Sequence, residues 1–187
     1  MIKPVIAALL GSLAFASMAQ ALEFNGIRND RSVLSFVYKQ MGVPMEGHFK
    51  KFDMQLNFDP AEPTAAMAML NVDLASIDTG SQEADDEVAG KAWFNTRAFP
   101  QARFISTRVK VLGGNRYEVS GTMSVKGRTQ NISVPFSFNP QGNTAVIEGA
   151  FVFKRADFAI GEGMWADFGT VANEIQIKFR FLASTGK

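Results

Sequence analysis

Apolar and polar residues alternate along much of this chain, and the alternation is clearest near its C-terminus. Between residues 174 and 181, charged and amide side chains alternate with four apolar ones, Ile175, Ile177, Phe179 and Phe181. Successive side chains of a strand point to opposite faces, whereas a helix would mix the two sets. The pattern therefore predicts a strand with one buried face.

Seven further stretches predict strands in the same way. They span residues 31–39, 52–59, 69–76, 104–113, 117–127, 129–139 and 145–155, with less certain inward faces in 104–113 and 145–155. Short turns separate several of them, including Gly113-Gly114-Asn115 and a turn around Gly127. Such turns join antiparallel neighbours, and no βαβ spacing is present. We expect an all-β fold, an extended antiparallel barrel of about eight strands.

One helix is predicted to interrupt the strands. Thr79-Gly80-Ser81-Gln82 matches a capping box, and Gly90 is a suitable stop. Four carboxylates follow the cap, at Glu83, Asp85, Asp86 and Glu87. Negative charge in the first turns of a helix is stabilised by its dipole. We therefore interpret this segment as a short helix with a charged outside, lying across one end of the barrel, and not as a catalytic cluster.

The first 21 residues have the features of a secretory signal peptide. Lys3 precedes an apolar run that is short for a membrane span, and the segment ends in Ala19-Gln20-Ala21, a signal peptidase pattern. We expect cleavage after Ala21, export in a Gram-negative bacterium, and a periplasmic or secreted protein. Residues 22–187 then form one domain, which is an ordinary length for a single core.

Composition excludes several classes of function. Without Lys3, the 19 basic residues fall to 18 and equal the 18 acidic ones, so the mature chain lacks the basic surface of a nucleic-acid binder. The chain has no cysteine, and its single histidine, His48, lies in a strand-like run that predicts a surface position. Nucleophilic and metal-dependent chemistry therefore have few candidate residues, and we expect neither a metal site nor an enzyme.

Phenylalanine dominates the predicted inward faces. The chain has 17 Phe but only two Tyr and two Trp. A filled aromatic core would account for this, and so would an apolar cavity, because eight-stranded barrels can hold one small ligand. The alternation of apolar and polar residues is the same in both cases, so the sequence pattern does not distinguish a filled core from a cavity.

Several motifs resemble the YceI-like family of secreted lipid- and polyisoprenoid-binding proteins. The most specific are a run with Phe94, Phe99, Pro100, Ala102, Phe104, Ser106 and Thr107, and a run with Gly121, Lys126, Gly127 and Thr129. Similar stretches cover nearly all of the mature chain. The resemblance implies a barrel of lipocalin type whose apolar cavity binds a long isoprenoid, such as a polyprenyl phosphate or a prenylated quinone precursor.

The expected ligand-binding residues follow from the inward strand faces and this resemblance. We expect the cavity to be lined by Leu34, Phe36, Tyr38, Leu56, Phe58, Val134, Phe136, Ile175, Ile177 and Phe179. Candidates for holding a head group at the mouth are Arg97, Arg103, Arg155 and Trp165. Where relatives often carry histidines, this chain has Arg31 and Gln40, and its helix lacks the family's Arg-Asp and His. These departures favour a neutral ligand over a diphosphate.

The main functional hypothesis is a periplasmic or secreted carrier of an isoprenoid or related lipid, without a further cofactor. One alternative is a quinone-binding accessory of a membrane cytochrome b-type redox system, since some relatives are fused to such domains. Others are a structural or stress-response barrel with a filled core, and an enzyme using Asp78, Asp85, Asp86 and Glu162. A hydrophobic lipid is the expected partner, nucleic acid is not, and a membrane redox partner and a homodimer stay open.

Overall fold

The computed structural model describes residues 22–186, and the predicted signal peptide lies outside them. These residues form one curled antiparallel sheet and one short α-helix, α1 (Gln82–Ala89). Among the described residues, no helix is long and apolar enough to span a membrane. The eleven strands are β1 (Phe24–Ile27), β2 (Val33–Gln40), β3 (Val43–Phe49), β4 (Phe52–Asn57), β5 (Met67–Asp73), β6 (Ile77–Asp78), β7 (Gln101–Gly113), β8 (Arg116–Val125), β9 (Arg128–Gln141), β10 (Thr144–Lys154) and β11 (Glu174–Thr185).

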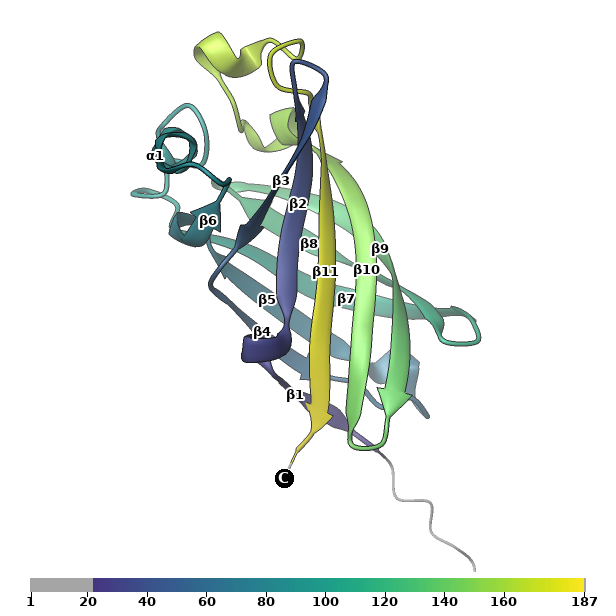
Figure 1. Ribbon diagram of the computed structural model, residues 1–187. Coiled ribbons are helices and arrows are strands. Elements are labelled where there is room, and N and C mark those ends of the chain that lie inside the picture. Colours follow the sequence, from purple (N-terminus) through teal and green to yellow (C-terminus); the bar gives the residue numbers. More distant parts are fainter. Residues whose placement is uncertain (1–21, 187) are drawn as a thin grey trace, which may run out of the picture.

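The sheet curls around an interior, with β1 at one end and α1 at the other (Figure 1). Its strand order is β4-β5-β7-β8-β9-β10-β11-β2-β3-β6, and β1 pairs with β11. The backbone of Phe24 in β1 also exchanges hydrogen bonds of 2.9 and 3.0 Å with Phe58, just after β4. Strand β1 thus links β11, in the middle of the sheet, to the end of the edge strand β4, and so closes one end of the curled sheet.

Tight turns join the long strands. Strands β8 and β9 are connected by Lys126 and Gly127, whose φ values of 49° and 73° are both positive. A two-residue turn of this kind matches the right-handed twist of the flanking strands, and glycine adopts it without a steric penalty. The predicted turn at Gly113 and Gly114 also has positive φ at both positions. The predicted hairpins are therefore confirmed.

The all-β, barrel-like fold with one short helix is confirmed, but the number of strands is larger than the eight predicted. The strands missed as separate elements are β1, β3 and β6. Strands β1 and β6 have only four and two residues, which is too short for alternation to show. Strand β3 contains Pro44 and Gly47 and is mostly exposed, so its apolar residues do not alternate with polar ones.

The uncertain inward face of β7 has a structural cause. Ala102 and Phe104 point inward at even positions, whereas farther along the strand the buried residue is Val109. The pairing of β7 with β8 shifts register between Ser106 and Arg108. An extra residue in one strand moves all later side chains to the opposite face, so a strict period of two fails across this bulge.

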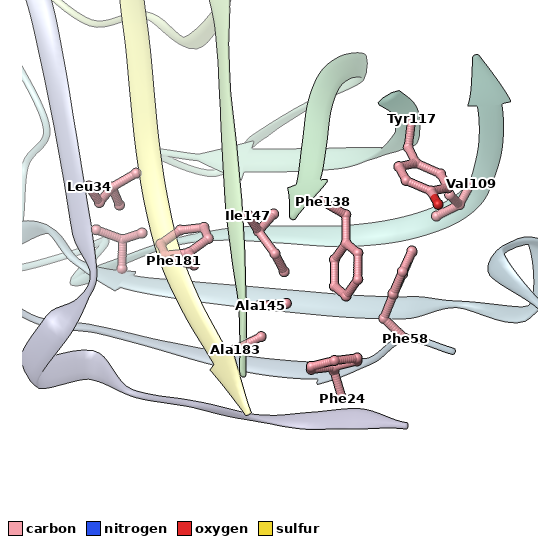
Figure 2. Packing of buried hydrophobic residues seen from close by; sticks show 11 residues of the cluster. Phe24, Leu34, Phe58, Val109, Tyr117, Phe138, Ala145, Ile147, Phe181 and Ala183 are labelled. Atoms are coloured by element: carbon pink, nitrogen blue, oxygen red, sulfur yellow. The ribbon is translucent and has the colours of Figure 1, made fainter. Parts of the chain in front are cut away.

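Aromatic side chains fill the β1 end of the interior (Figure 2). Phe24 and Phe138 are almost fully buried with their ring centroids 5.0 Å apart, and Phe58 lies 4.5 Å from Phe138. Tyr117 packs edge-on against Phe58 at 5.4 Å. Pairs at these distances add to the stabilisation from apolar burial. This end of the sheet therefore has a solid core.

Helix α1 begins two residues later than the capping-box motif predicts, with the cap at Ser81 instead of Thr79. The cap is Ser81, whose Oγ accepts a hydrogen bond of 3.2 Å from the backbone N–H of Ala84. Thr79 instead donates its backbone N–H and its hydroxyl to Asp85 Oδ1, at 2.8 and 2.7 Å. The helix ends before Gly90, as expected. Asp85 thus fixes α1 to the end of β6.

Candidate functional site

A cavity of about 650 Å³ occupies the interior of the curled sheet. Ligand pockets in proteins generally have volumes of about 300–1,000 Å³, so the space is large enough for a small lipid. The structure therefore contradicts the filled-core alternative. All ten side chains predicted to line a cavity do line this one, and their contact with a ligand stays a prediction. They are Leu34, Phe36, Tyr38, Leu56, Phe58, Val134, Phe136, Ile175, Ile177 and Phe179.

Glycines on the inward face of the sheet keep this interior hollow. Gly149 lies opposite Phe179, and Gly47 lies opposite Phe36 in the neighbouring strand. A Cβ atom on either glycine would overlap the ring of its partner, and one on Gly121 would lie 2.6 Å from Phe104 Cζ. The three rings therefore lie across backbone that carries no side chain. They cover the wall of the cavity and do not fill its centre.

The cavity is apolar along most of its length and polar at the α1 end. At the β1 end its lining includes Phe58, Phe136 and Ile147, which belong to the packed core there. The polar side chains that come from the end of β2 and from α1 with its preceding turn are Gln40, Thr79, Ser81, Glu83 and Glu87. An amphiphile would therefore place its apolar tail toward β1 and its head group toward α1.

The four carboxylates of the helix lie in different environments. Asp85 is held by Thr79, and Asp86 accepts a hydrogen bond of 2.9 Å from Gln82 on the exposed surface. Glu83 and Glu87 instead line the cavity on the same side of α1 as Ala84 and Val88. The predicted charged outside is confirmed, since Glu83, Asp86 and Glu87 are all exposed, and the two glutamates also border the cavity. Their spacing of four residues puts them on one face of the helix.

Tyr38 adds a neutral phenol to the lining near α1. Burial raises its pKa above the ordinary value, and the negative charge of Asp85 raises it further. The phenol therefore stays protonated near neutral pH and can donate a hydrogen bond.

Arg155 is not free to hold a head group, contrary to the prediction. Its side chain is buried, with the residue 1% exposed. A guanidinium has five N–H donors, and all five find backbone carbonyls here. The acceptors, at 2.7–3.1 Å, are Ile160, Gly161, Trp165, Val171 and Ala172. The guanidinium also lies over the rings of Trp93 and Phe168. Arg155 therefore organises the loop between β10 and β11.

The other predicted head-group residues are also placed unfavourably for that role. Arg97 is exposed and lies outside the cavity lining. Arg103 belongs to the lining, but its guanidinium contacts Met69 Sδ, and its neighbours Ala102 and Phe104 are the inward side chains of β7. Because strand side chains alternate, Arg103 points to the outer face. Trp165 does line the cavity, and its Nε1 donates to Glu87 Oε1 at 2.7 Å.

The remaining carboxylates considered for catalysis have ordinary ion-pair partners. Asp78 lies 2.9 Å from Lys50 and 3.7 Å from His48, which is at the surface of β3 as predicted. The hydrogen bond from Lys50 holds the pKa of Asp78 below its usual value. Lys126 lowers the pKa of Glu162 in the same way. Residues 22–186 contain no group of three or more His, Cys, Asp or Glu side chains placed to hold a metal.

Sequence reasoning missed the inward glycines, although they leave a signal. Gly121 and Gly149 occupy inward positions within predicted strands, between apolar residues two positions away on either side. Glycine inside a strand often marks a close approach of another group to the backbone. Read together with the many phenylalanines, these positions favour a hollow interior over a filled one.

Comparison with known proteins gives a consistent family assignment. The model of the YceI-like domain matches residues 26–183. A UPF0312 protein of Azotobacter vinelandii is 27% identical over 187 residues, covering 95% of this chain and 95% of its own length. A UPF0312 protein of Yersinia pestis is 29% identical over 184 residues, covering 94% of this chain and 93% of its own.

Solved structures share the fold. The crystal structure of Burkholderia cenocepacia BcnA has a TM-score of 0.83 and 41% identity, covering 85% of this chain and 100% of that one. A polyisoprenoid binding domain from Saccharophagus degradans has a TM-score of 0.68 at 14% identity, covering 89% and 100%. At that identity the second likeness concerns the fold alone. Since the family model spans nearly all of the described residues, this protein belongs to the YceI-like family.

Proposed function

We propose that this protein is a non-catalytic binding protein that holds a long-chain isoprenoid or related lipid inside its curled sheet. The observation that carries the proposal is the cavity of about 650 Å³, apolar along most of its length and polar at the α1 end. The similar structure from Saccharophagus degradans is described as a polyisoprenoid binding domain, which supports the same class of ligand.

The physical chemistry of the cavity suits such a ligand. Each buried CH₂ group contributes roughly 0.8 kcal/mol, so a five-carbon isoprenyl unit contributes about 3–4 kcal/mol before the costs of binding. A few units exceed the loss of translational freedom and the ordering of the chain. Binding then needs no catalytic group, and the depth of the cavity sets the preferred chain length.

Lipid extraction tests this proposal directly. The purified protein is extracted with organic solvent, and the extract is analysed by mass spectrometry for prenyl lipids. The delipidated protein is then titrated with Nile red, an uncharged fluorescent dye, and the dye is displaced with added isoprenoids. We expect a co-purified prenyl lipid and displacement by isoprenoids. An empty extract together with no displacement would refute the carrier function.

The proposed place of action is the periplasm or the exterior of the cell. This part of the proposal is supported by the N-terminal segment, with Lys3, an apolar run and a cleavage pattern at Ala19-Gln20-Ala21. Cell fractionation with N-terminal sequencing of the mature protein tests it. The expected first residue is Leu22, and retention in the cytoplasm with an intact Met1 would contradict it.

A quinone-holding accessory of a membrane redox system is a second candidate. The observation that favours it is the lack of a free cation among the lining side chains, since Arg155 is fully hydrogen-bonded and Arg103 points outward. A neutral ring suits that environment better than a phosphate. Absorbance of the extracted lipid before and after chemical reduction separates the two, because an inert chain shows no redox change.

A further inference from the structure

Four large apolar side chains are exposed where two loops meet beside the α1 end of the cavity. The β2–β3 hairpin supplies two of them and the β10–β11 loop the other two, and we call them the apolar tip: Met41, Val43, Met164 and Phe168. The N–H of Met41 donates a hydrogen bond of 2.9 Å to the carbonyl oxygen of Thr170, and the two loops lie side by side at the top of Figure 1. The apolar tip is therefore one surface.

Met41 has a backbone conformation that its residue type disfavours. Its φ is 49° and that of Gly42 is 81°, so the two residues form the tight turn of the hairpin. Asparagine, aspartate and glycine suit such positions, and a positive φ is unusual for a large side chain. Lys126 also has a positive φ, but its side chain is held by Glu162 and by the carbonyl of Ala159. Met41 is 74% exposed, so packing within the chain does not account for a methionine there.

The apolar tip continues the lining of the cavity. On β3, Val43 lies two positions from Met45 and pairs with Gln40 of β2. Met45 and Gln40 both line the cavity, and residues at these positions share one face of the sheet. In the loop, the exposed Met164 directly precedes Trp165, which also lines the cavity. Apolar surface therefore runs from the cavity wall to the outside of the protein.

The charges near the apolar tip restrict the kind of surface that it can meet. Residues 39–43 and 160–172 contain one basic and two acidic residues. One of the acidic residues, Glu162, is already in an ion pair of 2.9 Å, so the charges of the two loops nearly cancel. Glu83 and Glu87 add negative charge at the mouth of the cavity. Attraction of a polybasic segment to anionic lipids therefore has no counterpart here, and a strongly anionic membrane is a poor partner.

We propose that the apolar tip inserts into the surface of a zwitterionic lipid bilayer and holds the mouth of the cavity against it while a lipid passes in or out. This inference rests on the proposed lipid-binding function and adds the surface from which the ligand is taken. Apolar side chains gain free energy when they leave water for hydrocarbon, and a few of them give weak, reversible attachment. The continuous apolar surface lets a prenyl chain move between bilayer and cavity without crossing water.

Flotation with phosphatidylcholine vesicles, using a matched pair of variants, tests the inference. The tip variant combines Met41→Asn with Met164→Ser, and the control combines Val111→Ser with Leu112→Ser at the exposed end of β7. We expect the wild type and the control to bind the vesicles alike, and the tip variant to bind them about tenfold more weakly. The affinity of the tip variant for Nile red in solution should be unchanged, because neither methionine lines the cavity.

The single substitution Met41→Asn separates docking from folding. Asparagine adopts a positive φ more readily than methionine, so the urea midpoint should stay the same or rise while vesicle binding falls. A lower midpoint with unchanged vesicle binding would show that Met41 serves the hairpin and would overturn its role at the membrane.

Other results would also overturn the docking surface. They are no flotation of the wild type, equal losses in the tip variant and the control, and stronger binding when phosphatidylglycerol replaces part of the phosphatidylcholine. A wild-type dimer in sedimentation velocity that becomes a monomer in the tip variant would instead give the apolar tip to a second copy of the chain. The proposed function has a separate readout. If isoprenoids do not displace Nile red, lipid binding fails even where the protein floats with the vesicles.

Discussion

The ring of Phe179 lies across Gly149 of the neighbouring strand, in the space that a side chain at position 149 would occupy. Both residues are on the inward face of the sheet, and Phe179 lines the cavity. The glycine allows the ring to lie along the wall. The volume of the cavity therefore depends on an absent side chain as much as on the side chains present.

Replacing Gly149 with alanine should reduce both stability and lipid uptake. The new Cβ would overlap the ring of Phe179 and approach the carbonyl oxygen of Pro135 to 2.5 Å, so the ring must turn toward the lumen. Overpacking of this kind costs about 1–3 kcal/mol. Urea unfolding and Nile red titration measure the two effects.

A double-mutant cycle supplies the control for Gly149→Ala. Combining it with Phe179→Ala removes the overlapping ring, so the double variant should lose less stability than the sum of the single variants. Contacting residues show coupling energies of about 0.5–3 kcal/mol. Strict additivity of the two substitutions would show that the ring and the glycine do not compete for the same space.

Neutralising Glu83 should improve the binding of an anionic lipid. Glu83 is exposed at the polar end of the cavity. Glu83→Gln should therefore raise the affinity for farnesyl phosphate a few-fold at low salt and leave the affinity for farnesol nearly unchanged. The gain should shrink as salt screens the charge. Asp86→Asn is the matched control, since Asp86 belongs to the same helix but not to the cavity lining. An equal gain in both variants would point to the net charge of the protein and not to the mouth.

Removing the guanidinium of Arg155 should destabilise the loop between β10 and β11. Arg155→Met leaves five carbonyls without their donor, and we expect a loss of roughly 3 kcal/mol or more. Arg155→Lys keeps the charge but has only three donors, so its loss should be intermediate. Urea unfolding gives the loss, and hydrogen exchange should become faster in residues 158–173.

The exposed Arg97 provides the comparison for Arg155. Arg97→Met should change stability by no more than about 0.5 kcal/mol, as is usual for surface positions. Protection of the loop amides in Arg155→Met at the level of the wild type would contradict the anchoring role.

Asp78 should make stability depend on pH in the acid range. Its hydrogen bond from Lys50 lowers its pKa in the folded state below the ordinary value of 3.8. The stabilisation is therefore present above the unfolded pKa and is lost as pH falls through the lower folded pKa. The urea midpoint of Asp78→Asn should fall less steeply than that of the wild type from about pH 5 downward. Parallel curves for the two proteins would contradict this contribution.

Alternation was sufficient to predict the long strands and their inward faces, because both depend on which face a side chain occupies. Leu34, Val134 and Ile177 were placed on the inward face on that basis, and the family resemblance added the expectation that this face lines a cavity. Head-group residues could not be found in this way. Whether a charged side chain such as Arg155 meets a ligand or five backbone carbonyls depends on the path of a loop, and loops carry no periodic signal.

The position of β11 in the sheet has a consequence for the order of folding during synthesis. This strand lies between β10 and β2 and is also the strand with which β1 pairs. Strand β1 therefore cannot pair with β11 until β11 has been synthesised. Until then, the β2–β3 hairpin is also not connected to β10 through the sheet. Long-range pairing of this kind folds slowly. Strand β11 must be synthesised before the sheet can close, and a chain that lacks β11 would expose β1 and one edge of β2 at the same time.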